Sequence, residues 1–187
     1  MNLGSIAFRT FLIRFFGVFL FLYFGTEAWI GICAKGGIYL PWADQYFNYI
    51  DWIKKSLMYG IQWCVNNIWD YQTHFEPNYL IRINGKRGVY IAMGCVGYGV
   101  YSFWVAYIIA VPQKIINKMI WVFSGLFLLW IINVLRISMF LVAINEKKTM
   151  PLGIDHHTWF NIIAYSMILL LIYFYDKMTV TETKKSL

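Results

Sequence analysis

Three residue types that together can carry out acyl transfer stand far apart in this 187-residue chain: Cys95, Arg136 and the neighbouring His156 and His157. A thiolate is a nucleophile, whereas a thiol is a poor one. A nearby guanidinium favours the charged thiolate, and an imidazole can take the thiol proton and return it to a leaving amine. A cysteine with a histidine is therefore the smallest set of side chains for acyl transfer through a thioester.

Arg136 interrupts an apolar run, where the hydrocarbon of a bilayer tolerates a charge only at a cost. One interpretation is a functional cation, which can stabilise a thiolate and then the oxyanion of a tetrahedral intermediate. The plainer interpretation is an arginine that snorkels to the lipid head groups. Asn133 lies three residues earlier, on the same helical face, where it can orient Arg136 or contact a substrate.

The remaining candidate groups favour simpler interpretations. Cys33 and Cys64 are expected to be small apolar residues, because three widely spaced cysteines form neither a disulfide framework nor a zinc motif. Asp155, next to the histidine pair, adds one possible ligand, but no third or fourth ligand has suitable spacing. The sequence therefore predicts no metal and no cofactor. His74 is expected to be an ordinary exposed histidine in a loop.

The composition decides the environment in which these groups must be positioned. Sixty per cent of the residues are apolar and 13% are charged, against about a quarter charged in soluble domains. The net charge of +7 does not indicate nucleic acid, because the basic residues flank apolar runs or lie in loops, where they can meet anionic lipid. The sequence predicts an all-α polytopic membrane protein.

Apolar runs of about 20 residues predict four transmembrane helices within a single membrane domain of residues 1–187. The predicted spans are residues 11–32, 93–111, 119–144 and 158–175. Residues 35–91 form a polar and aromatic segment between the first two spans, and residues 176–187 form a basic tail.

Two short elements are predicted within residues 35–91. Residues 56–69 are uncharged and aromatic but too few to cross, so they indicate an amphipathic helix, either lying in the interface or re-entrant. Residues 79–83 and 88–91 flank Asn84-Gly85, a pair that favours a β-hairpin between alternating apolar residues. The hairpin leads directly into the second span.

The short basic loop with Lys114 and Lys118 favours a cytoplasmic position, with both termini inside and residues 35–91 outside. If the chain has four spans, one side of the membrane holds the start of the second span, the end of the third and the start of the fourth. Cys95, Arg136 and the histidine pair are therefore expected in the outer leaflet, with Arg136 roughly 12 Å from its exit at about 1.5 Å per residue.

The order of these motifs resembles the exosortase/archaeosortase family of membrane-embedded cysteine transpeptidases. The resemblance rests on Gly94-Cys95-Val96-Gly97 after a hairpin, Asn133-Val134-Leu135-Arg136 late in the next span, and a histidine that opens the last span. It covers about residues 79–175. The chain is short for the family, which indicates one of its compact branches. Many members have serine where this chain has Val96.

The resemblance implies that Cys95 is the nucleophile, Arg136 the stabilising cation and a histidine the general acid and base. His157 is preferred because Asn161 follows it at the family's four-residue spacing, and His156 stays open as the alternative. The implied substrates are secreted proteins whose C-terminal signal has a short motif, an apolar helix and a basic tail. Cleavage is expected at the outer face of the cytoplasmic (inner) membrane, and an amine, a hydroxyl or water resolves the thioester.

Two other functions stay open at this point. The chain can be a non-enzymatic accessory or transport protein that binds an anionic ligand or a lipid head group through Arg136. It can also be a membrane acyltransferase that uses a histidine, although this leaves Cys95 without a role.

Overall fold

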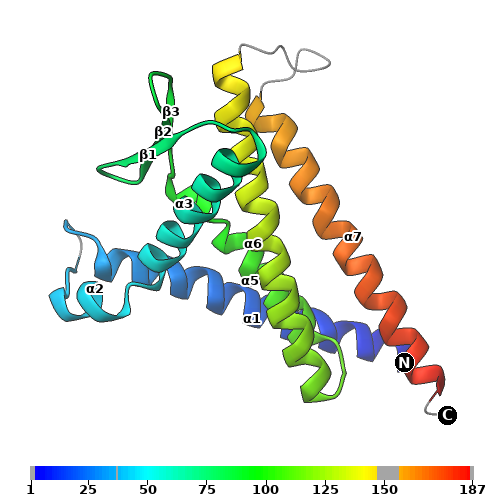
Figure 1. The fold of residues 1–187 in the computed structure, drawn as a ribbon. Coiled ribbons are helices and arrows are strands. Elements are labelled where there is room, and N and C mark those ends of the chain that lie inside the picture. The colour runs from blue at the N-terminus through cyan, green and yellow to red at the C-terminus, as the bar shows by residue number, and fades with distance from the viewer. Residues whose placement is uncertain (1–2, 37, 147–155, 186–187) are drawn as a thin grey trace. The chain divides into compact units, whose positions relative to one another are not determined.

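The structure is a computed structural model that describes residues 3–36, 38–146 and 156–185, and it is mostly helical (Figure 1). Its elements in chain order are α1 (Leu3–Cys33), α2 (Pro41–Phe47), α3 (Tyr49–Ile68), β1 (Thr73–Glu76), β2 (Leu80–Ile83), β3 (Gly88–Tyr90), α4 (Met93–Val96), α5 (Tyr98–Ala110), α6 (Ile115–Glu146) and α7 (His156–Lys185).

Three helical stretches among the described residues are long and apolar enough to cross a membrane: Ala7–Cys33, Met93–Ala110 and Ile115–Glu146. They overlap the first three predicted spans. The fourth predicted span, residues 158–175, falls within α7, where many side chains lie outside the described part of the chain, so the count of four stays a prediction. Length and composition are those of a helical membrane protein.

The chain packs as two compact units, which we describe separately. The first unit comprises Met1–Ser56 and Ala92–Leu126, and the second comprises Leu57–Ile91 and Phe127–Leu187. Helices α3 and α6 each pass from one unit into the other.

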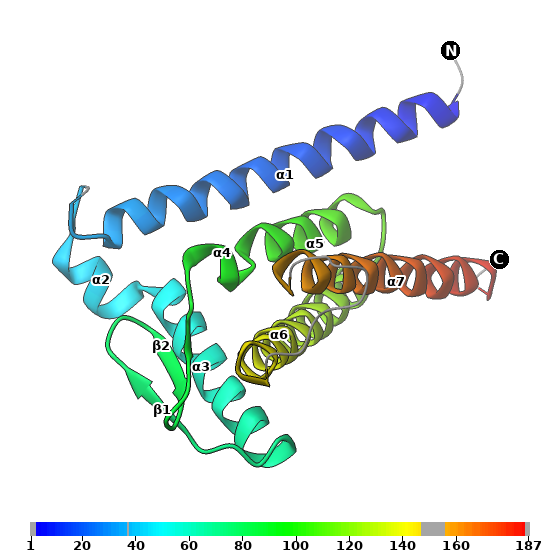
Figure 2. The same cartoon turned by 90° about the horizontal axis from the view of Figure 1, so that it is seen from above.

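Aromatic side chains join α1 to α5 in the first unit, where the two helices lie side by side (Figure 2). The rings of Phe15 and Phe103 meet edge to face at 5.2 Å, and those of Phe11 and Tyr107 at 6.1 Å, so the helices run in opposite directions. Ala106 contributes almost no side chain to this contact and is fully buried. Small residues let helices approach closely where lipid removes the hydrophobic driving force.

Trp104 of α5 fixes the packing against the first half of α6. Its side chain is fully buried, and its indole N–H donates a hydrogen bond to the Trp121 carbonyl oxygen at 3.1 Å. A Cβ atom at Gly125 would lie only 2.1 Å from the indole nitrogen. The indole therefore occupies space that only a glycine leaves open.

Helix α3 begins at Tyr49, earlier than the predicted start at residue 56. The charged residues that suggested a later start in fact support the first turn. Asn48 accepts a hydrogen bond from the Asp51 backbone N–H at 3.0 Å, as an N-cap does, and Asp51 itself favours the positive end of the helix dipole. The start of α3 is tied to α1 by the Tyr49 hydroxyl, which donates to the Thr26 hydroxyl at 2.9 Å.

The predicted amphipathic character of this helix is confirmed in the second unit. Leu57, Ile61 and Val65 are fully buried, whereas Tyr59 and Trp63 are exposed. The buried face approaches α6 at Gly60, where a Cβ atom would lie 2.8 Å from the Val134 side chain. The position of the exposed face relative to a membrane stays a prediction.

The predicted hairpin is confirmed as β2 and β3, paired antiparallel with Ile81 opposite Val89. At its turn the Lys86 N–H donates to the Ile83 carbonyl oxygen at 3.0 Å, and Gly85 has a φ of 71°. Asn84 keeps a negative φ, so the turn resembles type II and not the type I′ that an Asn-Gly pair favours.

Strand β1 was not predicted. It pairs antiparallel with β2 to complete a three-stranded sheet in the order β1-β2-β3. Its four residues, Thr-His-Phe-Glu, are too few and too polar to produce an alternation signal. The backbone pairing with β2 is what makes this segment a strand.

We expect Gly125→Ala to destabilise the protein by about 1–3 kcal/mol, because the methyl group must displace the buried Trp104 indole. The measurement is thermal unfolding in detergent followed by tryptophan fluorescence. Gly25→Ala is the matched control, since Gly25 lies in α1 with open space at its Cβ position. Equal unfolding temperatures for the two variants would contradict this account of the packing.

Candidate functional site

Cys95 lies in α4, a single turn that connects the sheet to α5 in the chain (Figure 2). Its backbone N–H donates to the Ala92 carbonyl oxygen at 3.0 Å. Gly97 ends this turn with a φ of 80°, a left-handed conformation that glycine adopts without strain. The Gly97 carbonyl oxygen then accepts the Val100 and Tyr101 N–H groups at 2.9 and 3.0 Å, and so begins α5.

The three cysteines differ in exposure. Cys33 and Cys64 are buried, with 8% and 2% of their surface exposed, whereas Cys95 is partly exposed. The interpretation of Cys33 and Cys64 as small apolar residues agrees with this burial. A reagent or substrate can therefore reach the thiol of Cys95 more readily than either of the others.

Arg136 lies in the second half of α6, in the second unit, and is partly buried. It is the only charged residue between Lys118 and Glu146 in this helix. Asn133, one turn earlier, is buried with 8% of its surface exposed. Two polar side chains thus occupy neighbouring positions on one face of a mostly apolar stretch of this helix.

The predicted histidine stands at the beginning of α7. The backbone of His156 and His157 forms the first turn of this helix, and Asn161 follows in the second. The side chains of all three lie outside the described part of the structure, and so does Asp155. Whether His156 or His157 faces a reaction centre therefore stays open.

Cys95 belongs to the first unit, and Arg136 and the start of α7 belong to the second. Their convergence, which followed from the order of the predicted spans, stays a prediction. Among the residues that the structure describes, no group of three or more His, Cys, Asp or Glu side chains could hold a metal ion.

Lys54 is a buried cation that the sequence patterns did not single out. It lies in the part of α3 that belongs to the first unit, with only 7% of its surface exposed. Burial lowers the pKa of its ammonium group, while Asp51 and Cys95 act in the opposite direction.

A signal for Lys54 was present in the sequence. Lys54 follows Ile50 by four residues and precedes Leu57 by three, so it falls on the apolar face of the helix. Lys55, the next residue, lies on the exposed side and pairs with the Asp51 carboxylate at 2.8 Å. The two lysines were not told apart because the predicted helix began after both of them.

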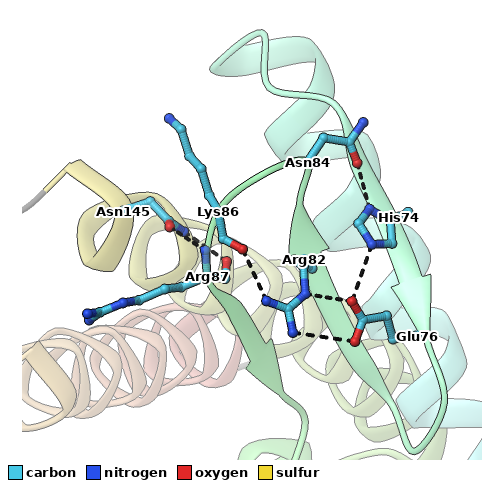
Figure 3. A network of polar contacts seen from close by, with 7 residues as sticks. All are labelled: His74, Glu76, Arg82, Asn84, Lys86, Arg87 and Asn145. Atoms are coloured by element: carbon cyan, nitrogen blue, oxygen red, sulfur yellow. Dashed lines mark hydrogen bonds and ion pairs between the residues drawn. The ribbon is translucent and has the colours of Figure 1, made fainter.

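A polar network covers one part of the sheet in the second unit (Figure 3). The Arg82 guanidinium donates to both Glu76 carboxylate oxygens, at 2.5 and 3.4 Å, and to the Lys86 carbonyl oxygen at 3.1 Å. Hydrogen bonding from Arg82 lowers the pKa of Glu76. The ring nitrogens of His74 lie 2.6 Å from the Asn84 side-chain oxygen and 3.3 Å from Glu76. His74 was expected in a loop, but β1 places it on the sheet.

Asn145 holds the hairpin against the end of α6 within the second unit (Figure 3). Its side-chain oxygen accepts the Arg87 N–H at 2.8 Å, and its amide donates to the Arg87 and Leu141 carbonyl oxygens at 3.0 and 2.8 Å. Tyr71 adds a second link, because its hydroxyl donates to the Glu146 carboxylate at 3.3 Å. The hairpin is therefore fixed to the same helix that carries Arg136.

We expect Asn145→Ala to release the hairpin from α6, because it removes both hydrogen bonds to the Arg87 backbone, each of which contributes about 0.5–1.5 kcal/mol. The measurement is hydrogen exchange of residues 80–90 in detergent. Asn67→Ala is the control, since the Asn67 amide donates to the Trp63 carbonyl oxygen within its own helix. Equal exchange in the two variants would contradict the proposed anchoring.

The chain was also compared with known proteins. A scan against protein-family models found no match, and neither did searches of curated proteins and of solved structures.

Proposed function

We propose that this chain is an exosortase-like cysteine transpeptidase or protease that cleaves the C-terminal sorting signal of secreted proteins. The observation that carries the proposal is the position of Cys95. It is the one partly exposed cysteine of the three, and it stands at the entry of a helix long enough and apolar enough to cross a membrane. A nucleophile at that place can reach a peptide bond just outside the bilayer.

The chemistry requires a thiolate, a cation and a proton carrier. Cys95 attacks the scissile carbonyl and forms a thioester, while the Arg136 guanidinium stabilises the oxyanion of the tetrahedral intermediate. His157, with His156 as the alternative, moves the protons of the leaving and entering groups. Asn133 and Asn161 orient these groups or the substrate. Placing a cation within an apolar helix is costly, which favours a functional role for Arg136.

The substrate follows from the same arrangement. A secreted protein that ends in a short motif, an apolar helix and a basic tail can insert its helix beside the helices of this protein. Its basic tail stays on the cytoplasmic side of the inner membrane, and the scissile bond then lies at the outer face, near Cys95. An amine, a hydroxyl or water resolves the thioester.

We expect Cys95→Ala to lower processing of such a substrate by a factor of about 10³ or more, because no other side chain replaces the nucleophile. The substrate is a secreted protein with this tail from the same genome, co-expressed with the variant, and its processing is followed by immunoblot. Membrane fractionation confirms that the variant inserts.

Cys64→Ala is the matched control, since it removes a buried thiol from the same protein. Trapping a thioester between Cys95 and a substrate fragment by mass spectrometry supports the proposal directly. Processing by Cys95→Ala at the rate of the parent protein would overturn it, and would leave an accessory or transport protein with an anionic ligand at Arg136.

We expect Arg136→Lys to lower processing about a hundredfold, because an ammonium group lacks the planar fork of donors that holds an oxyanion. Arg9→Lys is the control for the same change of side chain, at an exposed position near the start of α1. The initial rate of substrate cleavage in membranes is compared for both. A rate for Arg136→Lys equal to that of Arg9→Lys would remove the oxyanion role.

A further inference from the structure

Four basic side chains belong to one part of the first unit that contains no acidic residue. Arg9 and Arg14 lie in the first half of α1, Lys114 lies directly before α6, and Lys118 lies in its first turn. The described residues 3–26 and 92–126, which include all four, contain no Asp or Glu. Positive charges without acidic neighbours repel one another, so this part of the unit favours an anion.

The packing of α1 against α5 places Arg14 beside the last turn of α5 (Figure 2). Phe15, the residue after Arg14, belongs to the same buried cluster as Ala110, the last residue of α5. The Phe11 ring, one turn before Arg14, meets the Tyr107 ring edge to face at 6.1 Å. Arg14 itself is exposed, so a ligand can reach it at this end of α5.

Lys118 reaches the same end of α5 from α6. Its ammonium group donates to the Ile109 carbonyl oxygen at 2.6 Å. A lysine at the C-terminal end of a helix meets a carbonyl group without a partner in the helix and the negative end of the helix dipole. This contact uses one of the three ammonium N–H groups. Within the described part of the chain, neither Lys118 nor Arg14 pairs with a carboxylate.

The start of α6 is held against α5 independently of these charges. The Trp104 indole N–H donates to the carbonyl oxygen of Trp121, one turn after Lys118, at 3.1 Å. Gly125, one turn further, leaves the space that the indole fills. Uncharged packing contacts therefore bring the two cations to one end of α5.

Exposed apolar side chains beside the two cations favour a lipid as the occupant. Ile13, next to Arg14, has 72% of its surface exposed, and Ile109, whose carbonyl oxygen binds Lys118, has 41%. A soluble anion needs only the positive charges, whereas the acyl chains of a lipid also cover exposed apolar surface. Anionic lipids are typical of the cytoplasmic leaflet, the side on which the sequence predicts Lys114 and Lys118.

We propose that Arg14 and Lys118 bind the phosphate group of an anionic phospholipid at the end of α5. The planar guanidinium of Arg14 donates to the phosphate oxygens, and Lys118 donates through its remaining N–H groups. The acyl chains lie along Ile13 and Ile109. The phosphate supplies the negative charge that this part of the unit lacks, and by joining α1 to α6 it stabilises the packing of both helices against α5.

The test measures binding of phosphatidylglycerol to the full-length protein in an uncharged detergent, with phosphatidylcholine as the neutral lipid. Each lipid is titrated, and the rise in unfolding temperature, followed by tryptophan fluorescence, gives its apparent affinity. We expect phosphatidylglycerol to stabilise the protein more than phosphatidylcholine does. We expect its affinity to fall about fivefold in Arg14→Gln and about 25-fold when Lys118→Gln is added, since each cation contributes about a factor of five.

The matched control combines Lys35→Gln with Lys55→Gln, which removes the same charge from exposed positions elsewhere in the first unit. Equal affinities for phosphatidylglycerol in the control and in the double variant of Arg14 and Lys118 would overturn the proposal. Equal stabilisation of the parent by glycerol phosphate would also overturn it, because the site would then belong to a soluble anion.

Arg14→Gln alone keeps the test decisive if the double variant does not fold. Lys118→Gln also removes the contact with Ile109, whereas Arg14 is exposed and pairs with no carboxylate of the described residues. An unchanged affinity in Arg14→Gln would therefore exclude this site by itself. The measurement needs no catalytic activity, so its outcome is independent of the proposed function.

Discussion

Backbone N–H and C=O groups in hydrocarbon must find hydrogen-bond partners within the protein, and this constraint governs most of the chain. It is met by continuous helices, which satisfy the backbone from within one segment. Ala7–Cys33, Met93–Ala110 and Ile115–Glu146 have the length and the apolar composition for that solution. The sheet, whose edges expose backbone groups, occurs outside these helices, between Thr73 and Tyr90.

Helices that gain little from the hydrophobic effect must pack by shape, and small residues decide where that is possible. Gly125 makes room for the Trp104 indole in the first unit, and Gly60 allows α3 to approach Val134 of α6 in the second. Polar anchors complete the arrangement at the ends of helices. Asn145 binds the hairpin to the end of α6, and Asn48 begins α3 through its N-cap. These contacts position the segments that carry the proposed chemistry.

Two cations, Lys54 and Arg136, lie on apolar helix faces, where burying a charge costs free energy. Each has lost part of its water, and each is tolerated only if a nearby group gains from the charge. For Arg136 we propose that this group is the oxyanion of a reaction intermediate. For Lys54 the Asp51 carboxylate lies one turn earlier on the same helix.

The sequence alone predicted the mostly helical fold, three helices long and apolar enough to cross a membrane, the amphipathic face of α3 and the hairpin of β2 and β3. These follow from apolar run length and from periodicity, which are properties of a local segment.

Strand β1 and the first turn of α3 were not predicted from the sequence. Strand β1 depends on pairing with β2, and the first turn of α3 depends on a cap and on its anchor on α1. The convergence of Cys95, Arg136 and a histidine is still an expectation of the sequence. Only the tertiary structure could show that Cys95 is partly exposed where Cys33 and Cys64 are buried, and that Lys54 is buried while Lys55 faces outward. Burial and proximity arise from segments distant in the sequence, and no local pattern encodes them.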